Sequence, residues 1–183
     1  MRVVTVSTST RKGEKKIPQP QINLIENFGV EGDVHADGTH RQLSLLAMED
    51  IEYMRGIGAD VNPGDFAENI TTEGVELHKC PVGTRFMIGD SIELVLTQIG
   101  KECHNDCAIK KAVGKCVMPT EGIFVIVVKE GIVRAGDLQH HVCAAVIAVG
   151  AGEGLLVLVT LGEDHLLLQG SAVLLLGDPA LLL

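Results

Sequence analysis

The chain has 183 residues, and 46% of them are hydrophobic, so it is long enough for one compact domain with a sizeable core and an appendage. Only 3% of the residues are aromatic, so the core must depend on Val, Ile and Leu, and the β-branched members of that set favour strands. The net charge is −9, with no strongly positive part, which argues against nucleic acid as a partner.

The first part of the chain predicts short strands separated by loops. Residues 3–6 are rich in Val and Thr and predict the first strand, and residues 23–26 predict another. Residues 11–21 contain two prolines and predict a loop, whose basic cluster we interpret as solvated: Arg11, Lys12, Lys15 and Lys16. Residues 29–42 are rich in Gly and Asp and predict a long loop of the kind that often carries function.

A helix is predicted after this loop. Ser44 is a candidate cap, and the apolar positions that follow fall at helical spacing: Met48, Ile51 and Met54. Gly56 and Gly58 are expected to end the helix.

The middle of the chain predicts strands again. Residues 62–66 predict a turn and residues 69–72 an extended segment. Residues 84–100 and 122–137 each predict a pair of strands joined by a turn. The pattern therefore predicts a mainly β fold, an antiparallel barrel with one or two short helices.

The composition changes near residue 137. All 15 Lys and Arg residues lie at or before Arg134, and Leu supplies 13 of the 29 residues from 155 to 183. We therefore predict a domain at residues 1–137 and an apolar, Leu-rich tail at residues 138–183. The apolar runs of this tail are too short to span a membrane. Three interpretations of this tail are open: it forms buried strands, it binds a partner, or it results from an abnormal reading of the gene.

The cysteines predict the compartment. The N-terminal residues lack a long apolar segment, so no signal peptide is expected. Five cysteines, an odd number, then argue for reduced thiols and a cytoplasmic location.

The segment from 100 to 124 carries the strongest chemical signal, because three of its residues are cysteines: Cys103, Cys107 and Cys116. Thiolates are nucleophiles and ligands of soft metals, and the lysines nearby, including Lys101, favour the thiolate form. One reactive or ligating cysteine is one interpretation, and a metal site that also uses His104 is a second. The spacing does not match a common structural zinc pattern. A third interpretation is that these cysteines are small buried side chains of the core.

Two further segments contain candidate binding residues. His35, His40 and Arg41 lie in the predicted loop, and imidazole with guanidinium is suited to holding a phosphate or another oxyanion. These side chains could equally satisfy turns of a surface loop. Asn69, in the segment GDFAENITTEG, could hydrogen-bond a ligand or brace the turn.

Taken in order, these motifs resemble a known family. The sequence contains GDVHADGTHRQ, PGDFAENITTEG, VGTRFMIG, TQIGKECH and MPTEGIF, and together they are similar to the MOSC domain, named for the C-terminal part of molybdenum-cofactor sulfurases. The resemblance is to the small bacterial stand-alone members and covers about residues 1–137. It implies a MOSC-type β-barrel, with the family's cysteine at Cys103.

The resemblance also implies a function. Cys103 is expected to carry sulfur as a persulfide or to ligate molybdenum, with the molybdenum cofactor (molybdopterin) as the candidate ligand. His35, His40, Arg41, Asn69 and Lys101 are expected to bind the cofactor, and Cys107, Cys116 and His104 to tune the site or relay sulfur. Pyridoxal phosphate is not expected, because nothing here resembles the aminotransferase-like domain that carries it in the sulfurases.

The expected partners are a pterin cofactor or a protein that donates or accepts sulfur, and a homo-oligomer is compatible with the sequence. The sequence leaves open whether the chain is an enzyme. As an enzyme, it would be a sulfur transferase or would have an activity that depends on the molybdenum cofactor. The alternatives are a non-catalytic adaptor, which delivers cofactor or sulfur to a partner enzyme and docks by its tail, and a small Cys/His metal-binding module.

Overall fold

A computed structural model describes residues 1–102, 107–142, 145–149 and 156–160. The helices are α1 (Met48–Gly56), the 3-10 helix η1 (Leu77–Lys79) and α2 (Ala108–Val113). The strands are β1 (Arg2–Thr8), β2 (Ile17–Gln19), β3 (Gln21–Ile25), β4 (Gly29–Val30), β5 (Leu43–Ala47), β6 (Ile70–Glu73), β7 (Arg85–Ile88), β8 (Ile92–Ile99), β9 (Ile123–Lys129), β10 (Gly131–Arg134), β11 (Gln139–Val142), β12 (Ala145–Val149) and β13 (Leu156–Thr160). The prediction of a mainly β fold with short helices is confirmed.

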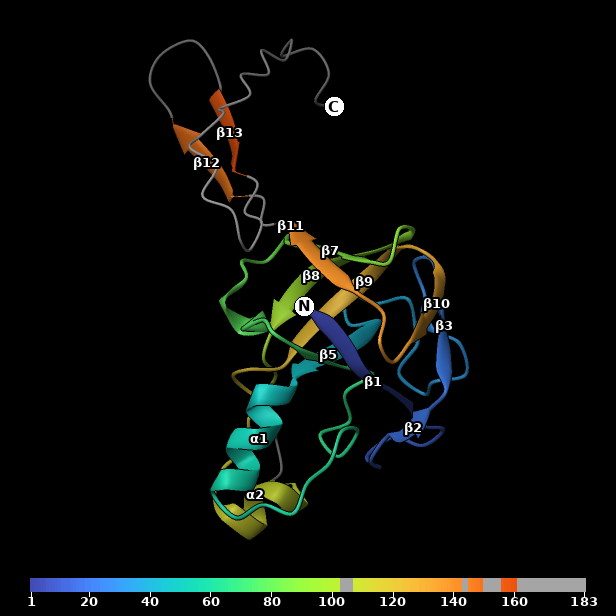
Figure 1. Ribbon diagram of the computed structural model, residues 1–183, viewed down its shortest axis with the longest axis vertical. Helices are drawn as coiled ribbons and strands as arrows, with labels where there is room; N and C mark the ends of the chain where they lie inside the picture. The colour runs from blue at the N-terminus through green and yellow to red at the C-terminus, as the bar shows by residue number, and fades with distance from the viewer. Residues whose placement is uncertain (103–106, 143–144, 150–155, 161–183) are drawn as a thin grey trace.

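The largest sheet has eight strands in the order β11-β7-β8-β9-β5-β6-β1-β2 (Figure 1). Its pairs are antiparallel except β5 with β6, which run parallel. The sequence explains the two kinds of strand. Buried residues alternate with more exposed ones along β8, as expected for a strand with one face on the core, whereas every residue of β5 is buried.

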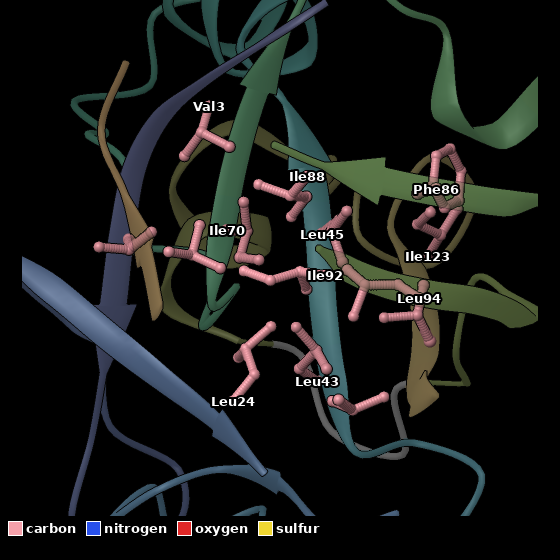
Figure 2. Close-up of a cluster of buried hydrophobic side chains, with 14 of the residues drawn as sticks. Val3, Leu24, Leu43, Leu45, Ile70, Phe86, Ile88, Ile92, Leu94 and Ile123 are labelled. Atoms are coloured by element: carbon pink, nitrogen blue, oxygen red, sulfur yellow. The ribbon is translucent and has the colours of Figure 1, made fainter. Parts of the chain in front are cut away.

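A second sheet, β10-β3-β4, lies against the first through contacts of β3 and β10 with β1. Apolar side chains from both sheets form the main core, and Leu24 of β3 lies in the same cluster as Leu43 and Leu45 of β5 (Figure 2). Among the described strands, the edges β11 and β2 of the large sheet do not pair with each other. The sheets are thus not closed into a barrel, and that part of the prediction is not confirmed.

The hairpin predicted at residues 84–100 is confirmed, since β7 pairs antiparallel with β8. The two strands predicted at residues 122–137 are present, but the prediction that they pair with each other is wrong. β9 stays in the large sheet while β10 pairs with β3. Only Glu130 separates β9 from β10, which is too short for a hairpin turn. The chain turns into the second sheet at Gly131, where an added Cβ would lie 2.5 Å from Ile92.

Two other local predictions are corrected. Residues 17–19 form a strand inside the predicted loop, and Pro18 is tolerated there because β2 is an edge strand. Ser44 does not cap α1, because it lies inside β5 and the helix begins at Met48. Its backbone N–H donates to Asn69, so the residue joins two strands of the sheet.

Helix α1 follows the predicted spacing, with Ile51 and Met54 fully buried. With Val117 and Met118 these residues form a second apolar cluster below the sheet. In Figure 1, α1 and α2 lie together at this end of the molecule. None of the helices in the described part of the chain has the length and apolar character that crossing a bilayer requires.

The predicted domain boundary falls beside a strand of the large sheet. Leu138 forms a bridge with Arg2, and β11 then pairs antiparallel with β7. Among the described strands, β12 and β13 pair with each other and with no third strand. The domain boundary at residue 137 stays a prediction. Because β11 lies just after this boundary and pairs with β7, removing β11 is the way to test it.

Candidate functional site

The predicted binding loop is fixed to the sheet by one buried carboxylate. Asp33 Oδ2 accepts hydrogen bonds from the Ser9 backbone N–H at 3.0 Å, from Lys16 Nζ at 2.5 Å and from Asn69 Nδ2 at 3.1 Å. Its other oxygen accepts the backbone N–H of His35 at 2.9 Å. One side chain thereby connects the ends of β1, β2 and β6 to the loop that carries His35.

Lys16 and Asp33 form a buried ion pair, with side chains 1% and 2% exposed. Burial by itself raises the pKa of Asp33, but hydrogen bonds from His35, Lys16 and the Ser9 amide outweigh it and hold that pKa well below its ordinary value. Burial lowers the pKa of Lys16, and the hydrogen bond to Asp33 opposes this shift. The interpretation of Lys16 as a solvated side chain is therefore wrong, although its neighbours Arg11, Lys12 and Lys15 are exposed.

Asn69 uses its side chain to brace the sheet. Its Nδ2 donates to the Ser7 carbonyl at 3.2 Å as well as to Asp33, and its Oδ1 accepts the Ser44 backbone N–H at 3.2 Å. The residue is 2% exposed. Its observed role is to hold the Asp33 carboxylate in place.

Gln98, at the end of β8, positions the two other predicted side chains of the loop. Its Oε1 accepts from Arg41 Nε at 2.9 Å and lies 3.0 Å from His40 Nε2. Its Nε2 donates to the Gly100 carbonyl at 2.7 Å. The Arg41 guanidinium also lies over the Phe124 ring, 5.2 Å from its centroid, which stabilises the cation by a cation–π contact.

A cavity of about 220 Å³ brings most of the predicted binding residues together. The lining includes His35, Arg41, Asn69, Lys101 and Lys16, whereas His40 is not part of it. Three of these side chains are cationic, and Asp37 is the acidic residue in the lining. Donors of this kind suit a phosphate or another oxyanion.

A larger cavity of about 790 Å³ adjoins it through Lys101, which lines both. Cys107 and Cys116 line this cavity, with Lys110 and Lys115. Cys103 and His104 lie outside the described residues. Lys101 and Glu102 on one side of that gap and Cys107 on the other all line the larger cavity.

The comparison with known families now adds to this geometry. The family model of the MOSC domain matches residues 32–138, more than half of the chain. The chain belongs to the MOSC domain family. Functions of this family are generally associated with the molybdenum cofactor.

Solved structures share the fold. The YuaD protein of Bacillus subtilis superimposes with a TM-score of 0.65 at 18% identity, over 76% of this chain and 94% of that one. YiiM of Geobacillus stearothermophilus gives 0.53 at 16%, over 75% and 73% of the chains, and YiiM of Escherichia coli gives 0.53 at 19%, over 78% and 70%. No curated protein matches the chain.

Sequence reasoning missed three residues that this MOSC domain uses to shape the site: Lys16, Asp33 and Gln98. Gln98 lies in the motif TQIG, so that motif held a usable signal. Lys16 and Asp33 meet through the tertiary structure, and no local pattern around Lys16 marks it as buried.

Proposed function

We propose that this MOSC domain binds the molybdenum cofactor, with its phosphate in the smaller cavity and Cys103 as the residue that ligates molybdenum or carries sulfur. The observation that carries the proposal is the convergence of His35, Arg41 and Lys101 on one cavity that adjoins a second one lined by thiols. The cationic lining fits the anionic end of the cofactor, and thiolate is a ligand of soft metals.

The sizes of the cavities support the same assignment. Ligand sites commonly have volumes of about 300–1,000 Å³, a range that includes the larger cavity and exceeds the smaller one. The smaller cavity therefore suits a phosphate group, and the larger one suits a pterin ring. When bound, the cofactor would supply the redox chemistry of its metal, and the protein's side chains would bind and orient it.

Transfer of sulfur would need no oxidant if the donor were itself a persulfide. The Cys103 thiolate would attack the outer sulfur of the donor, a new S–S bond would form at Cys103, and the donor would leave as a thiolate. Lys101, two residues before Cys103 and in the cavity lining, would favour the thiolate form.

Cofactor analysis of protein purified from a host that makes the molybdenum cofactor tests the proposal. Arg41→Ala and Lys101→Ala are expected to lower bound pterin and molybdenum about tenfold or more, because a hydrogen bond to a charged group contributes about 1.5–3 kcal/mol. Lys111→Ala is the matched control, since Lys111 is an exposed lysine outside both linings. Equal cofactor contents in all of these proteins would refute the proposal.

Cys103→Ser separates the two roles of the cysteine. Loss of molybdenum with retention of pterin would identify Cys103 as a metal ligand. A mass increase of one sulfur atom on the Cys103 peptide of the unsubstituted protein, reversed by dithiothreitol, would identify it as the sulfur carrier. If neither result is observed, Cys103 has neither role and is removed from the proposal.

A further inference from the structure

A second group of metal-binding side chains lies away from both cavities. Asp50 comes from the first turn of α1, His78 from η1 and Glu121 from the turn before β9. Ligand atoms of these three side chains all lie within 4.8 Å of one another, and each residue is half-buried. Three segments that are far apart in sequence thus place an imidazole and two carboxylates at one point.

One imidazole nitrogen of this group faces a carboxylate without a well-aligned hydrogen bond. His78 Nδ1 lies 2.7 Å from Glu121 Oε2. The same nitrogen is buried and makes no hydrogen bond of acceptable geometry within the described part of the protein. A buried polar atom without a hydrogen bond is costly, and a metal ion would satisfy it.

The charges of the group also favour a cation. Asp50 and Glu121 bring two carboxylates to one point, with ligand atoms within 4.8 Å of each other and of His78. Two carboxylates held close together at a half-buried position repel each other, and a divalent ion between them would remove that repulsion.

We propose that Asp50, His78 and Glu121 form a binding site for a divalent transition-metal ion, with Zn²⁺ as the ion of best fit. Imidazole with carboxylates is a ligand set that Zn²⁺ accepts, whereas Mg²⁺ and Ca²⁺ prefer oxygen ligands alone. With bonds of about 2.0–2.1 Å, tetrahedral ligands lie about 3.3 Å apart, so His78 and Glu121 would separate by less than about 1 Å. Water would complete the coordination.

The site would stabilise a wall of the larger cavity. Pro119 and Thr120, in the turn that carries Glu121, line that cavity. The Gly100 N–H donates to the Gly122 carbonyl at 2.6 Å, which connects this turn to the segment that leads to Cys103. An ion held by Asp50, His78 and Glu121 would join α1 and η1 to this turn. The proposal is independent of what the larger cavity binds.

Zn²⁺ binding to the full chain tests the proposal, with the three cysteines of the segment 100–124 removed as competing ligands. In a Cys103→Ser, Cys107→Ser, Cys116→Ser background, dialysis against Zn²⁺ followed by metal analysis is expected to give one bound ion per chain. His78→Gln and Asp50→Asn are each expected to weaken this binding at least tenfold. Glu76→Gln is the matched control, because Glu76 is an exposed carboxylate two residues from His78 and should have no effect.

Co²⁺ provides a second measurement, which reads the ligand set directly from the spectrum of the background protein. Co²⁺ at the proposed site is expected to give visible d–d bands without a strong thiolate charge-transfer band, and those bands should disappear in His78→Gln and in Asp50→Asn. Zn²⁺ is also expected to raise the melting temperature of the background protein and of Glu76→Gln, but of neither ligand variant. Binding that is lost in the triple-serine background, or that is unchanged by Asp50→Asn, would overturn the proposal.

Discussion

Asp33→Asn tests whether the buried ion pair holds the binding loop in place. The substitution keeps the shape of the side chain but leaves the Lys16 ammonium, 1% exposed, without its counter-charge. Breaking a buried ion pair from one side costs about 3–5 kcal/mol, because an uncompensated charge stays in the interior. That is a large part of the about 5–15 kcal/mol by which a domain is stable.

The pH dependence of the loss follows from Lys16. Burial already lowers its pKa, and without Asp33 the hydrogen bond that opposes this shift is gone. The folded variant then binds fewer protons than the unfolded chain at pH values between the folded and the unfolded pKa of Lys16. In that window the stability of Asp33→Asn is expected to rise with pH, so the deficit should be greatest at neutral pH and shrink in alkali.

Urea unfolding followed by circular dichroism measures both effects. Glu73→Gln is the control, because it breaks the Arg2–Glu73 pair, which is exposed, and such pairs contribute about 0–1 kcal/mol. Lys16→Met with Asp33→Asn completes a double-mutant cycle and is expected to recover part of the loss. If Asp33→Asn cost no more than Glu73→Gln, the ion pair would not hold the loop, and the reasoning would be refuted.

Three other predictions concern stability. Burial raises the pKa of Glu68, so the stability that this group contributes is present below its unfolded pKa and is lost as pH rises through its folded pKa. Glu68→Gln should therefore flatten the fall in unfolding free energy above the unfolded pKa, and curves that run parallel for the two proteins would contradict this. Gly100→Ala should lower the free energy of unfolding in urea more than Gly89→Ala does. Both glycines have positive φ, but only at Gly100 would an added Cβ meet backbone, 2.0 Å from a carbonyl oxygen. Equal losses of unfolding free energy in the two variants would exclude the clash. A chain that ends after Val142 keeps β11 and should melt in one transition. A chain that ends after Asp137 loses the pairing of β11 with β7 and should melt at a lower temperature. Equal melting temperatures of the two chains would support a domain boundary at 137.

Several elements could be predicted from local sequence because their signals are local. The turn at Gly89-Asp90 lies between two β-rich runs and gives the β7–β8 hairpin. The spacing of Ile51 and Met54 places both on the buried face of α1. The order of the motifs was sufficient to identify the family, and it named His35, Arg41 and Lys101, which line one cavity.

Other features depend on partners that are distant in sequence. The sequence around β9 and β10 resembles a hairpin, but the residues of β10 pair with β3, about a hundred positions earlier. The run LSLLA could be read as the start of a helix, and pairing of β5 with both β6 and β9 makes it a buried strand. Tertiary pairing therefore overrides local propensity at these positions.

The sequence by itself determined the family, the mainly β composition of the chain and the residue types available for binding an anion. Only the tertiary structure decided which charges are buried and which groups meet. Lys16 lies in an otherwise exposed basic cluster and is buried because Asp33, 17 positions away, accepts its hydrogen bond. Asp50, His78 and Glu121 come together because α1, η1 and the turn before β9 pack at one end of the sheet. The free energy of a charge depends on its surroundings in space, and those surroundings are supplied by long-range contacts.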